Sequence, residues 1–291
     1  MANDALDLGQ LRTFVAIADH GGFGRAATAL HLSQPAVSQH VRLLEKRLRR
    51  TLVEKDGRRT RFTAAGEELL MEARRIITAH DEALARLDLS TRPPVVIGST
   101  ETAAEQVLPR LLTTLRDAYP GRGAQFHIDR STQMTEAVLK GTIDLAVLLG
   151  FPGDTHGRLV GTLPLRWYSA PARPLPHRDQ PLALVAYREP CGMRQRALHR
   201  LAEAGHRVEV AAESTTLEGV IAAARAGLGV AVLPSTGVTP HGLVRRHDLP
   251  DLGEIGVHLA TRRDLDTDVT AVALGALEGF FESAPVSRLA G

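Results

Sequence analysis

Residues 32–48, LSQPAVSQHVRLLEKRL, decide the fold of the N-terminal part of the chain. Ser33 is a preferred N-cap residue, and Pro35 is tolerated in a first helical turn because its missing N–H would be unpaired there. Apolar residues then recur at helical spacing and predict one buried stripe, formed by Val37, Val41, Leu44 and Leu48. The stretch therefore predicts a helix that buries one face and leaves another polar.

The polar face of this helix carries side chains that can read DNA. Gln34, Ser38 and Arg42 share it, and such groups hydrogen-bond base edges and phosphates. A helix from about residue 23 to 30 precedes it across a tight turn, and this pair predicts a helix-turn-helix that places its second helix in the major groove. A solvated polar face with no partner is the alternative at this point.

A β-hairpin is predicted next, over residues 52–63. Asp56-Gly57 is a strong two-residue turn signal between two short strand-like runs. The second run holds three arginines, Arg58, Arg59 and Arg61, which can reach phosphates or a narrow minor groove. Residues 1–63 carry a net charge of +5 within a chain whose formal net charge is +2, so the positive charge gathers at this end. A solvated basic hairpin is the alternative.

The stretch from about residue 6 to 90 resembles the N-terminal winged helix-turn-helix of LysR-type transcriptional regulators. The segments LSQPAVSQHVRLLE (32–45) and RRTRFTAAGE (58–67) carry this resemblance. In that family the DNA contacts come from the start of the recognition helix and from the wing. The resemblance therefore implies these DNA-binding residues: Ser33, Gln34, Pro35, Ser38, Gln39, Arg42, Arg58, Arg59 and Arg61.

A long helix is predicted from Thr63, its N-cap, to about Asp88. Apolar residues and one histidine follow heptad spacing and predict a dimerisation seam of Leu70, Ala73, Ile77, His80, Leu84 and Leu87. A helix packed on its own domain is the alternative. The resemblance likewise implies a dimer through this helix, and a tetramer through the effector domains. Pro93-Pro94 then predicts a hinge.

Strands and helices alternate from Pro94 onward and predict an α/β domain with a mostly parallel sheet. The segments GTIDLAVLLG (141–150) and TTLEGVIAAARAGLGVAVLP (215–234) resemble the family's effector domain, which is similar to periplasmic solute-binding proteins. The predicted fold class is thus mixed: an all-α winged helix-turn-helix domain, a long linker helix and a two-lobed α/β effector-binding domain. The expected boundaries are 1–63 for DNA binding, 64–92 for linker and hinge, and 93–291 for effector binding, with lobe I at 93–165 and 266–291 and lobe II at 166–265.

Ligands of such α/β domains bind where strands end and helices begin. The candidate effector-binding residues on this rule are Ser99, Thr100, Thr102, Ser131, Thr132, Gln133, Leu149, Gly150, Cys191 and Thr215. Hydroxyls with free backbone N–H groups suit a small anion, although Glu101 would repel one. Ordinary helix caps are the alternative for each Ser and Thr. Cys191 sits at a predicted helix start, which lowers the pKa of a thiol and can make it reactive, but the favoured interpretation is a small buried thiol.

Several other classes lack their signatures. The single cysteine excludes an intramolecular disulfide, and no apolar run is long enough to span a membrane. The N-terminus does not resemble a secretion signal, so we expect a cytoplasmic, nucleoid-associated protein and not an exported solute-binding protein. The twelve histidines show no metal spacing, and no nucleophile elbow or P-loop occurs, so no enzyme, metal or cofactor is expected. An architectural DNA-bending protein would have no use for the α/β half.

The sequence therefore predicts a sequence-specific DNA-binding transcriptional regulator of LysR type, controlled by a small-molecule effector whose identity the residues do not give. Its expected partners are a double-stranded DNA operator, further copies of itself, and RNA polymerase if it activates transcription. The alternative is a ligand-independent DNA-binding repressor with a vestigial effector domain.

Overall fold

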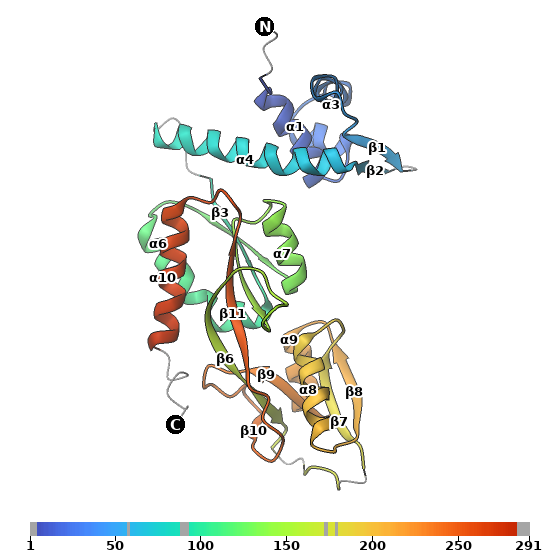
Figure 1. Cartoon of the computed structure of the whole chain (residues 1–291), viewed down its shortest axis with the longest axis vertical. Helices are drawn as coiled ribbons and strands as arrows, with labels where there is room; N and C mark the ends of the chain where they lie inside the picture. The colour runs from blue at the N-terminus through green and yellow to red at the C-terminus, as the bar shows by residue number, and fades with distance from the viewer. Residues whose placement is uncertain (1–4, 57–58, 88–92, 172–173, 178–179, 284–291) are drawn as a thin grey trace.

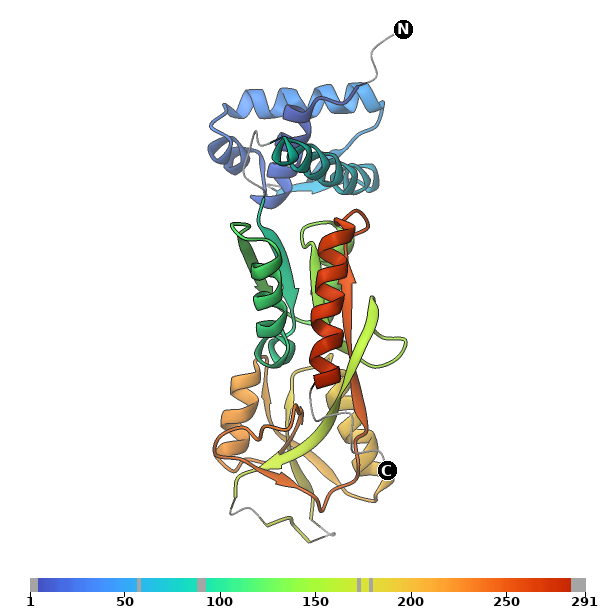
Figure 2. The ribbon, with the colours of Figure 1, turned by 90° about the vertical axis from the view of Figure 1, so that its left-hand side faces the viewer.

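The computed structural model describes residues 5–56, 59–87, 93–171, 174–177 and 180–283. A small helical domain lies at one end of the long axis, a long helix crosses beneath it, and two α/β lobes follow one after the other (Figures 1 and 2). In the described ranges, no helix has the length and apolar character needed to span a membrane.

The N-terminal domain is a winged helix-turn-helix, as the sequence predicts. Its elements are α1 (Leu8–Asp19), α2 (Phe23–Ala29), α3 (Gln34–Leu48), β1 (Val53–Asp56) and β2 (Arg59–Phe62). Val37 and Leu44 of α3 are fully buried against Leu11 and Phe14 of α1, so the apolar stripe forms the core. Ser33 caps α3 by accepting a hydrogen bond from the Ala36 N–H at 3.3 Å.

The wing is fixed to the helices at both ends. The Glu45 carboxylate accepts hydrogen bonds from the N–H groups of Leu52 and Val53, at 2.9 and 3.4 Å. After the hairpin, the Thr63 hydroxyl donates to the Thr51 carbonyl at 2.7 Å and accepts from the Gly66 N–H at 3.0 Å. Glu45 is half-buried on α3, and this contact gives it a structural role.

The linker helix α4 (Ala64–Arg86) packs on its own domain over its first half. Leu70 is 6% exposed and Ala73 is fully buried in the core that α1 shares, and Ile77 packs partly against the same core. The expected dimerisation seam is therefore corrected for Leu70 and Ala73, because the core shared with α1 already buries them; the half-buried Ile77 stays a prediction. The later positions His80 and Leu84 are half-buried, and Leu87 is 67% exposed.

Lobe I is a sheet with helices on both faces. Its elements are β3 (Val95–Ser99), α5 (Glu101–Gln106), α6 (Leu108–Ala118), β4 (Ala124–Ile128), α7 (Ser131–Leu139), β5 (Leu145–Gly150) and the last helix, α10 (Thr267–Ser283). Helices α6 and α10 lie side by side on one face, and α7 covers the other (Figure 1). Residues 101–118 form two helices and not one. Pro109 lies in the first turn of α6, since proline cannot donate the N–H that an unbroken helix would need there.

Lobe II has its own parallel strand pairs. Its elements are β6 (Arg158–Ser169), β7 (Leu182–Tyr187), α8 (Gly192–Glu203), β8 (Val208–Ser214), α9 (Leu217–Arg225), β9 (Val230–Pro234) and β10 (Val244–Arg246). Strand β6 is long enough to run through both lobes (Figure 2). Its residues near Arg158 pair in lobe I, whereas those from Leu165 pair with β9 in lobe II, so the first crossover lies near Leu165 as expected.

The second crossover falls earlier than expected. Strand β11 (Glu254–Thr261) lies antiparallel between β5 and β6 in the sheet of lobe I. The return to lobe I therefore lies just before Glu254, and not at 262–266. The pairing explains this placement, because β11 fills the gap between two strands and buries Val257 and Leu259 at its centre.

Candidate functional site

The first part of α3 offers a polar surface with free hydrogen-bonding groups. Gln34, Gln39 and Arg42 are exposed, and Ser38 is half-buried beside them. Among the described residues, none of these four side chains takes part in a hydrogen bond or an ion pair. The opposite face of α3 is buried, so the helix is held rigidly while this face stays open. Such a surface suits base edges and phosphates.

Of the three arginines expected to bind DNA from the wing, the structure describes the side chain of one, Arg61. The Arg61 side chain is 70% exposed and lies 3.6 Å from the Glu54 carboxylate on the paired strand. Arg58 lies outside the described residues, and for Arg59 only the backbone is described, in register with Asp56. An exposed ion pair of this kind is weak, so Arg61 can exchange Glu54 for a phosphate at small cost.

The two lobes enclose a cleft of about 700 Å³. Its lining comes from the ends of β3 and β5 and the start of α7 on lobe I, and from the end of β7 and the start of α8 on lobe II. Eight of the ten expected effector-binding residues line it: Thr100, Thr102, Ser131, Thr132, Leu149, Gly150, Cys191 and Thr215.

Two expected residues lie elsewhere. Ser99 is 1% exposed, and its hydroxyl donates to the Thr100 carbonyl at 3.0 Å, so its role is structural. Gln133 is exposed on α7 outside the cleft lining. Of the residues inside, Ser131 has committed its hydroxyl to the Leu149 carbonyl at 2.7 Å. The Thr100 hydroxyl, by contrast, is buried and finds no hydrogen-bond partner among the described residues, so a ligand could satisfy it.

Cys191 is at the N-cap position of α8 and is half-exposed on the cleft wall. The favoured expectation of a small buried thiol is therefore corrected, because the cleft leaves this residue partly open.

The sequence reasoning missed several cleft residues because lobe II brings them in from β7 and its neighbouring loop. Tyr187 is the last residue of β7 and Arg188 follows it, whereas Arg130 of lobe I directly precedes α7. Burial raises the pKa of the Tyr187 phenol above its usual range, so this group remains a proton donor at neutral pH. Its hydroxyl lies beside that of Thr102 on the other lobe.

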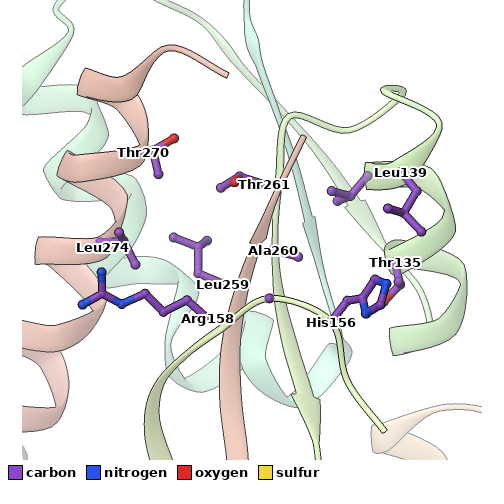
Figure 3. A pocket seen from close by; sticks show the side chains of 11 residues that line it. Thr135, Leu139, His156, Arg158, Leu259, Ala260, Thr261, Thr270 and Leu274 are labelled. Carbon is purple, nitrogen blue, oxygen red and sulfur yellow. The ribbon is translucent and has the colours of Figure 1, made fainter. Parts of the chain in front are cut away.

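A second, smaller cavity of about 300 Å³ lies on lobe I, away from the cleft. Figure 3 shows its walls: Thr135 and Leu139 from α7, Thr270 and Leu274 from α10, with Leu259 and Thr261 of β11 between them. The cleft between the lobes is the stronger candidate for the effector site, because it is larger than this cavity and gathers charged groups from both lobes. In the described part of the chain, no cluster of side chains could hold a metal ion.

A winged helix-turn-helix joined through a linker helix to a two-lobed α/β domain with a cleft defines a DNA-binding regulator with a ligand-binding domain. Comparison with known families agrees. The family described as "Bacterial regulatory helix-turn-helix protein, lysR family" matches residues 8–67, and "LysR substrate binding domain" matches residues 90–277. The chain belongs to the LysR family of transcriptional regulators.

Individual relatives support the same assignment. The chain is 34% identical over 279 residues to the HTH-type transcriptional regulator PecT of Dickeya dadantii, covering 94% of this chain and 87% of the relative. Among solved structures, ArgP from Mycobacterium tuberculosis has a TM-score of 0.74 at 21% identity, covering 96% of this chain and 99% of ArgP. LysG from Corynebacterium glutamicum with bound effector Arg has a TM-score of 0.65 at 21% identity, covering 94% of this chain and 98% of LysG. PecT is a transcriptional regulator, and the family model for the N-terminal domain describes regulatory proteins, so this chain is a transcriptional regulator.

Proposed function

We propose that a small molecule binds in the cleft between the lobes and changes how the protein binds its operator. The observation that carries this proposal is the cleft itself, in which polar and charged side chains of both lobes line one space of about 700 Å³. A ligand that contacts both lobes binds most tightly to the arrangement of the lobes in which side chains from each lobe reach it. Binding therefore shifts the protein toward that arrangement.

DNA binding in this proposal uses the exposed start of α3 and the wing. The major groove is read by Gln34, Ser38, Gln39 and Arg42, and Ser33 and Pro35 lie at the start of the same helix. The phosphate backbone of the DNA is contacted by Arg58, Arg59 and Arg61 of the wing. Two such domains pair through the later part of α4, with His80, Leu84 and Leu87 in the contact. The paired recognition helices then reach grooves about 34–36 Å apart. Effector domains pair further into a tetramer, and an activator would also contact RNA polymerase.

A gel-shift titration tests the DNA part. The probe is the DNA immediately upstream of the protein's own gene, in about 150 mM salt with excess competitor DNA, because salt and competitor remove non-specific charge attraction. Binding that survives competition supports a specific operator. Loss of all binding under these conditions, with and without metabolites, and no specific site in genome-wide footprinting would contradict the proposal.

The same assay tests the cleft. Metabolites are screened for one that shifts the titration, and the response is repeated with Thr132→Trp, since Thr132 is exposed at the cleft edge. The variant should lose the response and keep its DNA affinity. Gln133→Trp is the matched control, because it lies one residue further on α7 and outside the lining. A regulator with a vestigial effector domain would show no response to any metabolite.

A further inference from the structure

One carboxylate joins the two lobes across the cleft. Glu101 is the first residue of α5 on lobe I, and its Oε2 accepts a hydrogen bond from the Leu217 N–H on lobe II. Leu217 is the first residue of α9, a helix of nine residues. The two residues are 116 positions apart in the chain.

The start of α9 is the kind of place where an anion binds. Its backbone N–H groups point out of the helix end, and the helix dipole adds partial positive charge there. The Thr216 side chain satisfies one of these groups, the Gly219 N–H, at 3.2 Å. The Glu101 carboxylate satisfies the Leu217 N–H, so a group of the protein itself already occupies the anion position.

The rest of α5 fixes this arrangement. Two more residues of α5 contact lobe II. The Thr102 hydroxyl lies beside that of Tyr187, and the Gln106 amide donates to the Pro234 carbonyl at 3.3 Å. Glu101 therefore does not reach α9 as an isolated flexible side chain, because its helix contacts lobe II at further points.

The remaining oxygen of Glu101 is available to a ligand. Glu101 lines the cleft, and its Oε1 has no hydrogen-bond partner among the residues that the structure describes. Asp129 and Asp154 add negative charge to the lining, whereas Arg130 and Arg188 add positive charge. An acidic group near α9 would meet the Glu101 carboxylate, whereas a hydrogen-bond donor would find an open acceptor.

We infer that Glu101 determines the charge class of the effector: it fills the anion position at the start of α9, so the cleft accepts an effector whose group at this end is neutral or cationic. An acidic group of the same effector would bind near Arg130 or Arg188, the cationic side chains of the cleft lining. This inference rests on the proposed function, because it assigns a ligand class to the same cleft.

Sulfate is the probe that tests the inference, titrated by calorimetry into the full-length protein at constant ionic strength. Glu101→Ala uncovers the Leu217 N–H and removes the repulsion, so sulfate affinity should rise about tenfold or more over the wild type. Glu105→Ala is the matched control, because Glu105 is an exposed acid one turn further along the same helix. It should leave sulfate affinity unchanged.

A double variant tests where the sulfate binds. Leu217→Pro removes the N–H at the first position of α9, where proline is tolerated. Combined with Glu101→Ala, it should abolish the gain in sulfate affinity. Equal sulfate affinity in the wild type and Glu101→Ala, or a gain that survives Leu217→Pro, would overturn the inference.

Circular dichroism and the melting temperature check that each variant folds. If Glu101→Ala does not fold, Glu101→Gln replaces it, since the amide oxygen can keep the bond to Leu217 while the charge is lost. A smaller gain in sulfate affinity is then expected, and no gain would contradict the inference. The operator gel shift tests the proposed function separately. If Glu101→Ala gains sulfate affinity but the wild type responds to no metabolite in the gel shift, the proposed function is refuted and the inference about Glu101 is not.

Discussion

Arg262 and Asp144 form a buried ion pair where β11 ends and β5 begins, with Nε 2.7 Å from Oδ1. The Arg262 side chain is 7% exposed and that of Asp144 is 15% exposed. Asp144 also accepts a hydrogen bond from the Val96 N–H at 2.8 Å, so it fixes β3. On its other side, Arg262 lies 3.8 Å from the Glu82 carboxylate on α4. One guanidinium therefore joins the linker helix to the sheet of lobe I.

Loss of this guanidinium should destabilise the protein. Arg262→Met leaves Asp144 buried without its cation, and we expect a cost of about 3 kcal/mol, at the lower end for a broken buried pair because Val96 still donates to Asp144. Urea unfolding measures the change. Arg263→Met is the matched control, since Arg263 is the exposed neighbour. An equal effect of both variants would show that the pair is not responsible.

His258 should make stability depend on pH. It is 8% exposed on β11, and its buried Nδ1 has no hydrogen-bond partner in the part of the chain that the structure describes. Burial lowers the pKa of His258 below the ordinary value of 6.5. The unfolded chain therefore binds the proton first as the pH falls, so stability decreases below about pH 6.5.

His258→Gln should reduce this acid loss, measured as melting temperature from pH 7.5 to 5. His199→Gln is the control, because the His199 side chain is 69% exposed. If the wild type and His258→Gln lose stability in parallel over this range, His258 does not contribute.

Gln34 and Ser38 should set operator preference. Each residue that contacts a base edge contributes about 1–3 kcal/mol of discrimination, so Gln34→Ala or Ser38→Ala should weaken operator binding while non-specific binding stays the same. Competition gel shifts against operator variants measure the preference. Gln180→Ala, an exposed change in lobe II, should have no effect. Unchanged selectivity in both α3 variants would rule out a reading role for this face.

Arg61 should contribute charge and not selectivity. Arg61→Gln removes one phosphate contact, so binding should weaken for all sequences and the slope of log affinity against log salt should fall by about 1. Arg110→Gln is the control, since Arg110 is exposed on α6, far from the wing. A slope that stays the same in Arg61→Gln would exclude a phosphate contact.

Leu87 should belong to the dimer contact. Its apolar side chain is 67% exposed at the end of α4, so it is open to contact with a second copy of the chain. Leu87→Arg should weaken the dimer, because it places a charge in an apolar contact, and sedimentation velocity at several concentrations measures the shift toward monomer. Leu139→Arg is the matched control, since Leu139 is 58% exposed on α7. A dimer that persists in Leu87→Arg would place the contact elsewhere.

The local elements of this protein follow from its sequence. Ser33 and Thr63 cap helices where their side chains predict, and the apolar stripe of α3 is the buried one. Both effects act within one or two helical turns, so neighbouring residues are enough to determine them. The buried strand at 145–150 likewise follows from its own apolar run.

Tertiary structure decided which surfaces meet. The spacing on α4 shows that Leu70 and Ala73 face something apolar, and only the fold shows that α1 covers them. The insertion of β11 between β5 and β6 depends on residues about a hundred positions apart. The contact of Glu101 with α9 is of the same kind. Periodicity records that a face is buried, but not what covers it, because that partner is chosen by packing across the whole chain.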